Sequence, residues 1–453
     1  MRVTRRELLC GAGGFAGAVL LGESVVGAAH RRRPRSRRAA KTQRVADSGP
    51  LSGTKLYEDV IAYYNLGEHR TATEADLRTS QWLIQRLRAA GLKATFQSFS
   101  LRQFFVRQTR LTIGEKSIRA FPLWFPRSTG PDPLSGSVAG FEKIAEQGSL
   151  KGRIALVKFP AEAGAAVTKG SIHSDIILAA AKAGAAAIVA MTESATKEIV
   201  ALNAPAGAEP WPIPVVLVGA RDESALMAAA RPGTKASLVL DGEDDADAKA
   251  KNVIARVDRG KDLIVVSTPQ SGWFRCAGER GPGIALFLGL ARWASRRPSG
   301  ASFLFVSTSG HELGGLGMRA FLRELAPTPD RVLCWIHLGA GIATYAWEEK
   351  ATGPNRLQEP DSRRTLMSSP DLVPLLTTTF AGLAGLTPTV ERAVGEFDFM
   401  LKAGYRAFGI AAAHRFHHTP ADSPEMTGTQ ILEPVGRALI NTIEGIESGG
   451  VRN

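Results

Sequence analysis

Five nearly continuous apolar runs in the second half of the chain constrain its fold most strongly. Nearly continuous apolar runs of this length are typical of strands buried on both faces. Helix-like stretches lie between them, such as residues 283–297 and 371–385. This alternation favours an α/β fold with a mixed, mostly parallel sheet in three αβα layers. The runs are residues 251–257, 262–268, 302–308, 332–338 and 407–413.

The first half of the folded chain shows two patterns. A helix-like stretch, in which Thr73 and Asp76 have the spacing of a capping box, precedes an alternating strand at residues 92–99. Short β-branched runs then flank one helix-like stretch and indicate a small α/β insert with its own core. We therefore expect one domain made of residues 55–127 and 244–453, interrupted by an insert at residues 128–243.

The N-terminus has the pattern of an export signal. Arg5 and Arg6 precede a Gly/Ala-rich apolar stretch that ends in the small residues "VVGAA". Residues 1–29 resemble a twin-arginine signal peptide, and residues 30–54 read as a basic disordered linker. Glu23 interrupts the apolar run, which makes it short for a membrane span. We expect a periplasmic or extracellular protein that is not integral to the membrane after cleavage.

The charge of the chain is concentrated in this N-terminal part. Residues 1–50 hold 11 Lys and Arg against 3 Asp and Glu, so +8 of the net +13 lies there. Motifs that read bases or phosphates are absent from the sequence, so no nucleic-acid partner is expected. Three cysteines do not make a disulfide framework, although Cys276 and Cys334 could pair in an oxidising compartment.

A Gly-rich turn, "SGHELGGLG", follows the apolar run at residues 302–308. Ligand sites in sheets of this kind form at the carboxyl ends of strands. His311 and Glu312 are therefore candidate site residues.

Four segments together resemble the M28 metallopeptidases, a family of exported aminopeptidases that shares its scaffold with glutaminyl cyclases. Residues 128–243 are similar to a protease-associated domain, through "KGRIALVKF", "AAKAGAAAIV" and "IPVVLVG" in that order. The resemblance covers residues 55–447 and implies a zinc-peptidase-like fold. The four segments are "LGEHRTATEADLRTSQWLIQRLRAAGL", "GERGPGIALFLGLAR", "HELGGLGMRAFL" and "HHTPADSPE".

Members of this family normally hold two zinc ions, and one of the two metal positions has lost its ligands here. The family's His-x-Asp falls on Thr268 and Gln270, and a later Asp ligand falls on Gly339. His337 lies two residues before Gly339, on the same face of a strand, and is an alternative donor. The resemblance therefore argues against the usual two-zinc site.

The second metal position keeps residues that can bind zinc. The bridging Asp of the family falls on Glu279, a Glu ligand on Glu312 and the late His on His418. Two carboxylates and one imidazole with an open fourth place form a known catalytic zinc set, which would hold one ion. Arg280 is adjacent to Glu279 and could pair with either carboxylate instead. His417 and His414 read as loop or surface residues.

His311 stands where the family has its catalytic Glu, and three roles remain open for it. It could act as a general base, as a further metal ligand or as a hydrogen-bonded remnant. Cys276 could act as a nucleophile activated by His311, although no third group is identifiable.

Three hypotheses for the function follow. The first is a single-zinc hydrolase of aminopeptidase type, with a peptide or small molecule as substrate. The second is an inactive pseudo-peptidase that binds a peptide or a partner. The third is a metal-free catalyst that uses Cys276, His311 or Glu279. The position of the Arg280 guanidinium distinguishes the first two: it either leaves the point between the predicted zinc ligands free or occupies it.

Overall fold

The computed structural model describes residues 49–140, 149–161, 164–205, 207–231 and 233–449. The predicted signal peptide and nearly all of the predicted linker lie outside these residues. At the described end of the linker span, Leu51 is buried and Gly53 begins the first helix. None of the described helices is long and apolar enough to cross a membrane.

Four parallel strands form the centre of the sheet, in the order β16-β11-β9-β10. Antiparallel β14 and β8 flank them, and the short β15 pairs parallel to β14. This mixed, mostly parallel arrangement confirms the predicted fold class. The strands are β9 (Leu263–Pro269), β10 (Ser302–Thr308), β11 (Val332–Leu338), β14 (Thr365–Ser368), β15 (Pro388–Thr389) and β16 (Ala407–Ala411).

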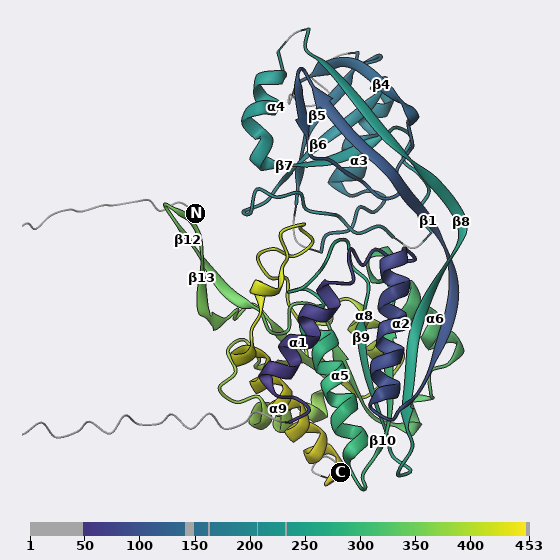
Figure 1. Ribbon diagram of the computed structural model, residues 1–453, viewed down its shortest axis with the longest axis vertical. Coiled ribbons are helices and arrows are strands. Elements are labelled where there is room, and N and C mark those ends of the chain that lie inside the picture. The colour runs from purple at the N-terminus through teal and green to yellow at the C-terminus, as the bar shows by residue number, and fades with distance from the viewer. Residues whose placement is uncertain (1–48, 141–148, 162–163, 206, 232, 450–453) are drawn as a thin grey trace, which may run out of the picture. The chain divides into compact units, whose positions relative to one another are not determined.

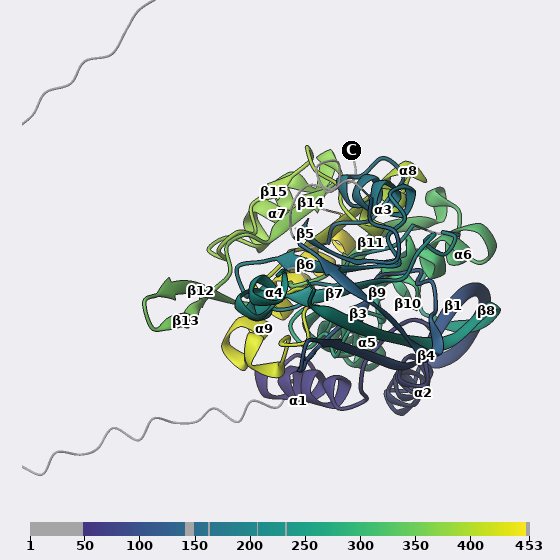
Figure 2. The same ribbon diagram turned by 90° about the horizontal axis from the view of Figure 1, so that it is seen from above.

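Helices cover both faces of this central sheet, as Figure 2 shows. The first face carries α1 (Gly53–Tyr64), α2 (Glu74–Ala89), α5 (Gly281–Arg296), α7 (Val373–Thr379) and α9 (Thr429–Glu447). The second face carries α6 (Leu316–Glu324) and α8 (Glu396–Lys402), whose apolar residues pack with those of β10 and β11.

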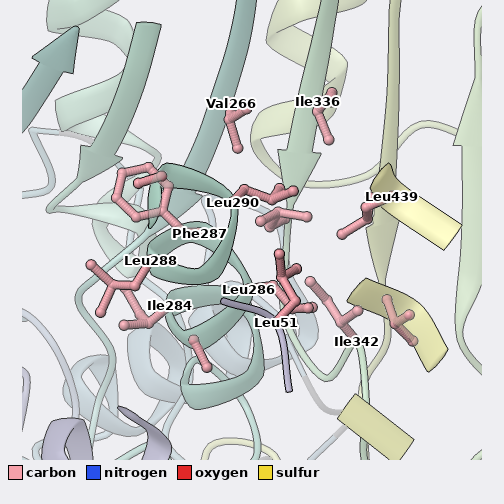
Figure 3. Close-up of a cluster of buried hydrophobic side chains, with 14 of the residues drawn as sticks. Leu51, Val266, Ile284, Leu286, Phe287, Leu288, Leu290, Ile336, Ile342 and Leu439 are labelled. Atoms are coloured by element: carbon pink, nitrogen blue, oxygen red, sulfur yellow. The ribbon is translucent and has the colours of Figure 1, made fainter. Parts of the chain in front are cut away.

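Helix α5 lies in the middle of the first layer. Nearly all its residues from Gly281 to Ala291 are apolar and all are buried, which is expected of a helix with protein on every side. In Figure 3, Leu290 of α5 lies toward the strand residues Val266 and Ile336, and Leu286 lies beside Leu51 and Ile342 in the same apolar cluster. This packing fixes the start of α5, and with it the preceding turn at Glu279 and Arg280.

Two long antiparallel strands, β1 (Lys93–Ile113) and β8 (Lys235–Val257), run side by side from the helix-covered strands to the region of β4–β7 (Figure 1). Their pairing shifts register between Leu101 and Gln103 and between Val106 and Gln108. β8 passes without a break through residues 243 and 244, where the sequence predicts a domain boundary. The two segments predicted as separate strands on either side of that boundary are therefore one strand.

The region predicted as an insert continues the same sheet through pairing of β4 with β8. β4–β7 are mutually parallel, and α3 packs on β5 and β6 to form a separate apolar core. The elements of this region are β4 (Gly130–Ala139), β5 (Ile154–Pro160), α3 (Ile172–Lys182), β6 (Ala187–Glu193), β7 (Val215–Gly219) and α4 (Glu223–Ala229). Two short strands, β2 (Lys116–Ile118) and β3 (Phe121–Pro122), precede the predicted insert, and β3 pairs with β7. A separate hairpin consists of β12 (Tyr345–Lys350) and β13 (Gly353–Pro360).

Candidate functional site

The predicted site residues gather beyond the carboxyl ends of the parallel strands. Gln270 and Ser271 follow β9, and a single turn of 3-10 helix at His311–Leu313 follows β10. The loop after β16 brings His417 and His418 to the same place, beside Glu279. Chain segments far apart in sequence thus meet at this edge, as expected for a parallel sheet.

The Arg280 guanidinium lies between the carboxylates of Glu279 and Glu312. Its Nη2 is 2.9 Å from Oε1 of Glu279 and 2.5 Å from Oε1 of Glu312. Its Nε donates to the carbonyl of Ser271 at 2.9 Å, which fixes the plane of the group. All three charged side chains are at most 3% exposed. The structure therefore brings together the two predicted carboxylate ligands, with an internal cation between them.

Burial and charge act in opposite directions in this cluster. Burial alone would lower the pKa of Arg280, but the carboxylates of Glu279 and Glu312 outweigh it and raise that pKa. Burial would likewise raise the pKa of Glu279, but the His417 and His418 rings and Arg280 hold it well below its usual range. Arg280 and Glu279 are thus both charged, and the pair satisfies the requirement that a buried charge be matched.

A segment of the predicted insert, residues 199–204, covers this cluster. The backbone of Ala201 accepts a hydrogen bond from Nδ1 of His418 at 3.0 Å and donates one to its carbonyl at 2.9 Å. Ala204 donates from its backbone to the carbonyl of Glu312. Nε2 lies 3.3 Å from Oε1 of Glu279, and although burial would lower the pKa of His418, the Glu279 carboxylate raises it and favours the ring with both nitrogens protonated. The segment therefore fixes both the orientation of the imidazole and the Glu312 turn.

His311 contacts a carboxylate that sequence reasoning missed. Its Nδ1 is 3.1 Å from Oε1 of Glu396, at the start of α8, and Thr308 donates to Oε2 at 3.0 Å. Burial would raise the pKa of Glu396, but the hydrogen bond and charge of His311 outweigh it and lower that pKa. An acidic residue in the first turn of a helix is common, so Glu396 gave no signal in the sequence.

Asp422 is a second residue that sequence reasoning missed. Its carboxylate oxygens accept hydrogen bonds from the backbone of Gly278 at 2.7 Å and of Glu279 at 3.0 Å, and Oδ2 lies 3.3 Å from Nε2 of His414. Asp422 thereby holds the turn that presents Glu279 and Arg280. It lies in the "HHTPADSPE" segment, four residues after His418.

The positions that lost the usual ligands serve the fold instead. Thr268 donates to the carbonyl of Leu338 at 2.8 Å, and Gln270 donates to Ser80 in α2 at 2.6 Å. A Cβ at Gly339 would lie 2.7 Å from the carbonyl oxygen of Ile410, so no carboxylate ligand fits there without a shift. A two-zinc centre does not fit these residues.

The remaining candidates also have defined environments. His337 is buried with Nδ1 3.0 Å from Oγ of Ser267, and burial lowers its pKa to about 4. Cys276 is buried and donates to the carbonyl of Phe274, and burial raises its pKa well above the usual value. A thiol in this environment is a poor nucleophile. Cys276 and Cys334 are both free, so the disulfide considered above does not form.

One group of donors fits a single metal ion by chemistry and spacing. Glu279, His417 and His418 each offer a ligand atom, and these atoms lie within 4.8 Å of one another. This group differs from the predicted set, because Glu312 faces Arg280 and His417 takes its place. His417 is buried, whereas the sequence favoured a loop or surface position.

A cavity of about 340 Å³ opens beside the cluster. Arg280, His417 and His418 lie in its wall together with His311 and His337. Its size is at the lower end of the range of about 300–1,000 Å³ that is typical of small-molecule sites. Arg280 and the histidines of the site are therefore reachable from this cavity, and Asn203 of the covering segment forms part of its wall.

Comparison with solved structures identifies the architecture. The zinc aminopeptidase BSAP from Bacillus subtilis aligns with 87% of this chain and 95% of its own length, with a TM-score of 0.67 and 18% sequence identity. The chain has the fold of a zinc aminopeptidase. A peptidase M28 precursor from Shewanella amazonensis aligns with a TM-score of 0.67 and 16% identity, covering 88% of this chain and 94% of its own. An aminopeptidase from Aneurinibacillus sp. aligns at 0.58 and 15%, covering 88% and 94%. Comparisons with protein-family models and with curated proteins give no match.

Asp76 accepts a hydrogen bond from Ser309, close to the His311 turn, and makes the free energy of unfolding depend on pH. Its carboxylate accepts from Ser309 and from the backbone of Ala72, and burial raises its pKa to about 6. A raised pKa means that the folded state favours the protonated form. The stabilising contribution is therefore complete below pH about 4 and is lost as the pH rises through about 6.

We expect the free energy of unfolding of the parent, relative to Asp76→Asn, to fall by about 2 kcal/mol between pH 4 and pH 7. Urea denaturation of both proteins across this range measures the difference. Parallel pH profiles would show that Asp76 does not titrate there.

Proposed function

We propose that the chain is a ligand-binding protein on the aminopeptidase fold that does not act as a metal-dependent peptidase. The observation that carries this proposal is the position of Arg280, whose Nη2 contacts both Glu279 and Glu312. These are the carboxylates that the resemblance assigns to zinc. A guanidinium bound to both supplies the positive charge that they require when buried.

A guanidinium does not supply the chemistry of a zinc ion. It has no open coordination position and cannot bind and activate a water molecule as a metal does. Binding of a peptide or small molecule in the 340 Å³ cavity needs neither property. The proposal therefore keeps the recognition surface of the fold and omits its hydrolytic step.

A single-metal hydrolase is the second candidate, and the group of Glu279, His417 and His418 favours it. One carboxylate and two imidazoles would hold zinc and leave one position open for water, which the ion would activate when bound. His311, held by Glu396, could then take up a proton from that water. Against this candidate, Oε1 of Glu279 is already in contact with Arg280.

We also infer export, from the arginine pair and apolar stretch at residues 1–29. Detection of the chain outside the cytoplasm, and its retention in the cytoplasm after Arg5 and Arg6 are both replaced by lysine, would test this inference.

We expect the purified chain to hold far less than one equivalent of zinc after dialysis against zinc, and its melting temperature to be unchanged by EDTA. Elemental mass spectrometry and thermal denaturation measure both properties. Leucine p-nitroanilide and similar aminoacyl substrates should not be hydrolysed.

The test variant is His417→Ala, His418→Ala, which removes two of the three possible ligands. His311→Ala, which leaves that group intact, is the control. About one equivalent of zinc in the parent and in His311→Ala, lost in the double variant, would overturn the proposal and support the single-metal hydrolase.

A further inference from the structure

The wall of the cavity beside Arg280 includes two arginines with unused donors. Arg280 has a buried Nη1 without a hydrogen-bond partner, and the side chain of Arg392 has no partner among the described residues. We propose that the cavity binds a ligand that carries both an amide carbonyl and a carboxylate, such as an N-acylated amino acid or the C-terminal end of a peptide. This inference rests on the proposed function as a ligand-binding protein.

Nη1 of Arg280 is a buried donor without a partner. Nε and Nη2 are engaged by Ser271, Glu279 and Glu312, but Nη1 has no hydrogen-bond partner among the described residues. The side chain is 1% exposed and lies in the cavity wall. An unsatisfied buried donor of this kind costs free energy, so a ligand that supplies an acceptor gains affinity.

The acceptor for Nη1 should be neutral. Arg280 already faces two carboxylates, and a third anion against Glu279 and Glu312 would be repelled. A carbonyl oxygen accepts the hydrogen bond without adding a charge. An amide carbonyl is the strongest neutral acceptor that a peptide or an acylated amino acid offers.

Arg392 supplies a position for a negative charge. It is exposed, lies in the wall of the same cavity, and has no ion-pair or hydrogen-bond partner in the part of the chain that the structure describes. Arg363, also in the wall, is held by Asp361, and the one carboxylate of the wall, Glu396, is held by His311. The guanidinium that remains free at the cavity is therefore that of Arg392, which matches a carboxylate.

Titration calorimetry with three small probes tests both contacts. N-acetylalanine carries the carbonyl and the carboxylate, N-acetylalaninamide lacks the carboxylate, and butanoate lacks the amide. We expect N-acetylalanine to bind about tenfold more tightly than either of the others, a difference of about 1.4 kcal/mol. Acetyl-tetraalanine, with the same ends, distinguishes the two sources: comparable binding indicates a peptide C-terminus, and loss of binding indicates a free acylated amino acid.

Variants of the full chain locate the carboxylate contact. Arg392→Gln should remove the preference for the acid over its amide, whereas Arg392→Lys should keep part of it. Arg296→Gln is the matched control, because Arg296 is an exposed arginine outside the cavity wall. Equal binding of the acid and the amide, unchanged by Arg392→Gln, would overturn the inference and leave ligand binding in the cavity intact.

Two further outcomes separate this inference from the proposed function. If none of the probes binds at millimolar concentration, the inference is wrong, and the zinc and hydrolysis measurements still decide the proposed function. If N-acetylalanine binds with the expected preference and is also deacetylated in a zinc-dependent reaction, the ligand class is supported and the proposed function fails.

Discussion

Replacement of Arg280 by methionine is expected to lower the free energy of unfolding by about 3–5 kcal/mol. The substitution keeps much of the side-chain volume but leaves Glu279 and Glu312 buried beside each other without the guanidinium that contacts both. It also removes the hydrogen bond from Nε to Ser271. Urea denaturation at pH 7 measures the loss. Added zinc should recover part of it, because the freed carboxylates and His418 then have no other cation.

The control for this prediction is Arg296→Met, which removes an exposed arginine from the last position of α5, the helix that Arg280 precedes. A loss within about 0.5 kcal/mol is expected there, as for most surface substitutions. A second variant, Arg280→Met with Glu312→Gln, should be more stable than Arg280→Met alone, because it removes one uncompensated charge. If Arg280→Met lowers the free energy of unfolding by less than about 1 kcal/mol, Arg280 does not provide the stabilising charge that a metal ion would give to Glu279 and Glu312.

Asp422→Ala should lower the free energy of unfolding by about 3–5 kcal/mol and loosen the turn at Glu279. The carboxylate accepts two buried backbone hydrogen bonds, from Gly278 and Glu279, and each bond to a charged group is worth about 1.5–3 kcal/mol. Its removal leaves two buried N–H groups without acceptors. Urea denaturation gives the loss, and faster amide hydrogen exchange at residues 278–279 would localise it.

Asp422→Asn is the graded comparison, because its side chain keeps one acceptor oxygen and should lose about half as much. Asp132→Ala, at an exposed position, should have little effect. Unchanged amide exchange at residues 278–279 in Asp422→Ala would show that the turn is held by the packing of α5 instead.

The secondary structure of the central sheet was largely predictable from sequence. β9 and β10 are buried along their whole length and β11 at all but one position, so their apolar runs carried a clear signal. The start of α2 was also predictable, since Thr73 precedes its first residue. The prediction of a capping box was wrong. Thr73 donates to the carbonyl of Arg70, and the Asp76 carboxylate accepts hydrogen bonds from the backbone of Ala72 and from Ser309.

Continuity between elements was harder to predict than the elements themselves. The acidic residues of β8 around Asp244 and Asp245 look like a loop in sequence, yet they pair with β1. Residues 243–247 are exposed or half-buried, so no pattern of buried residues identifies a strand there. Because these residues gave no strand signal, the sequence analysis placed the end of the predicted insert at residue 243.

The site was predictable only where the resemblance placed a residue. Glu279 lies beside His418, whereas Glu312 reaches Glu279 only through Arg280. The alternative pairing of Arg280 with these carboxylates is therefore the one that the structure contains. Glu396 and Asp422 lie in loops or at a helix start and act through contacts across the fold. Such contacts have no periodicity in sequence, so reasoning from spacing alone could not find them.

The shared strands β1 and β8 also restrict how the length of this chain can change. Leu238 and Leu240 fill the core near β4–β7, whereas Val253 and Ala255, farther along the same strand, fill the helix-covered core. Because side chains alternate between faces, one added or deleted residue between these pairs would turn one of them toward the wrong side. Only the irregular positions near Gln103 and Gln108 already accommodate unequal numbers of residues on the two strands. Insertions and deletions that preserve folding should therefore concentrate at these two positions.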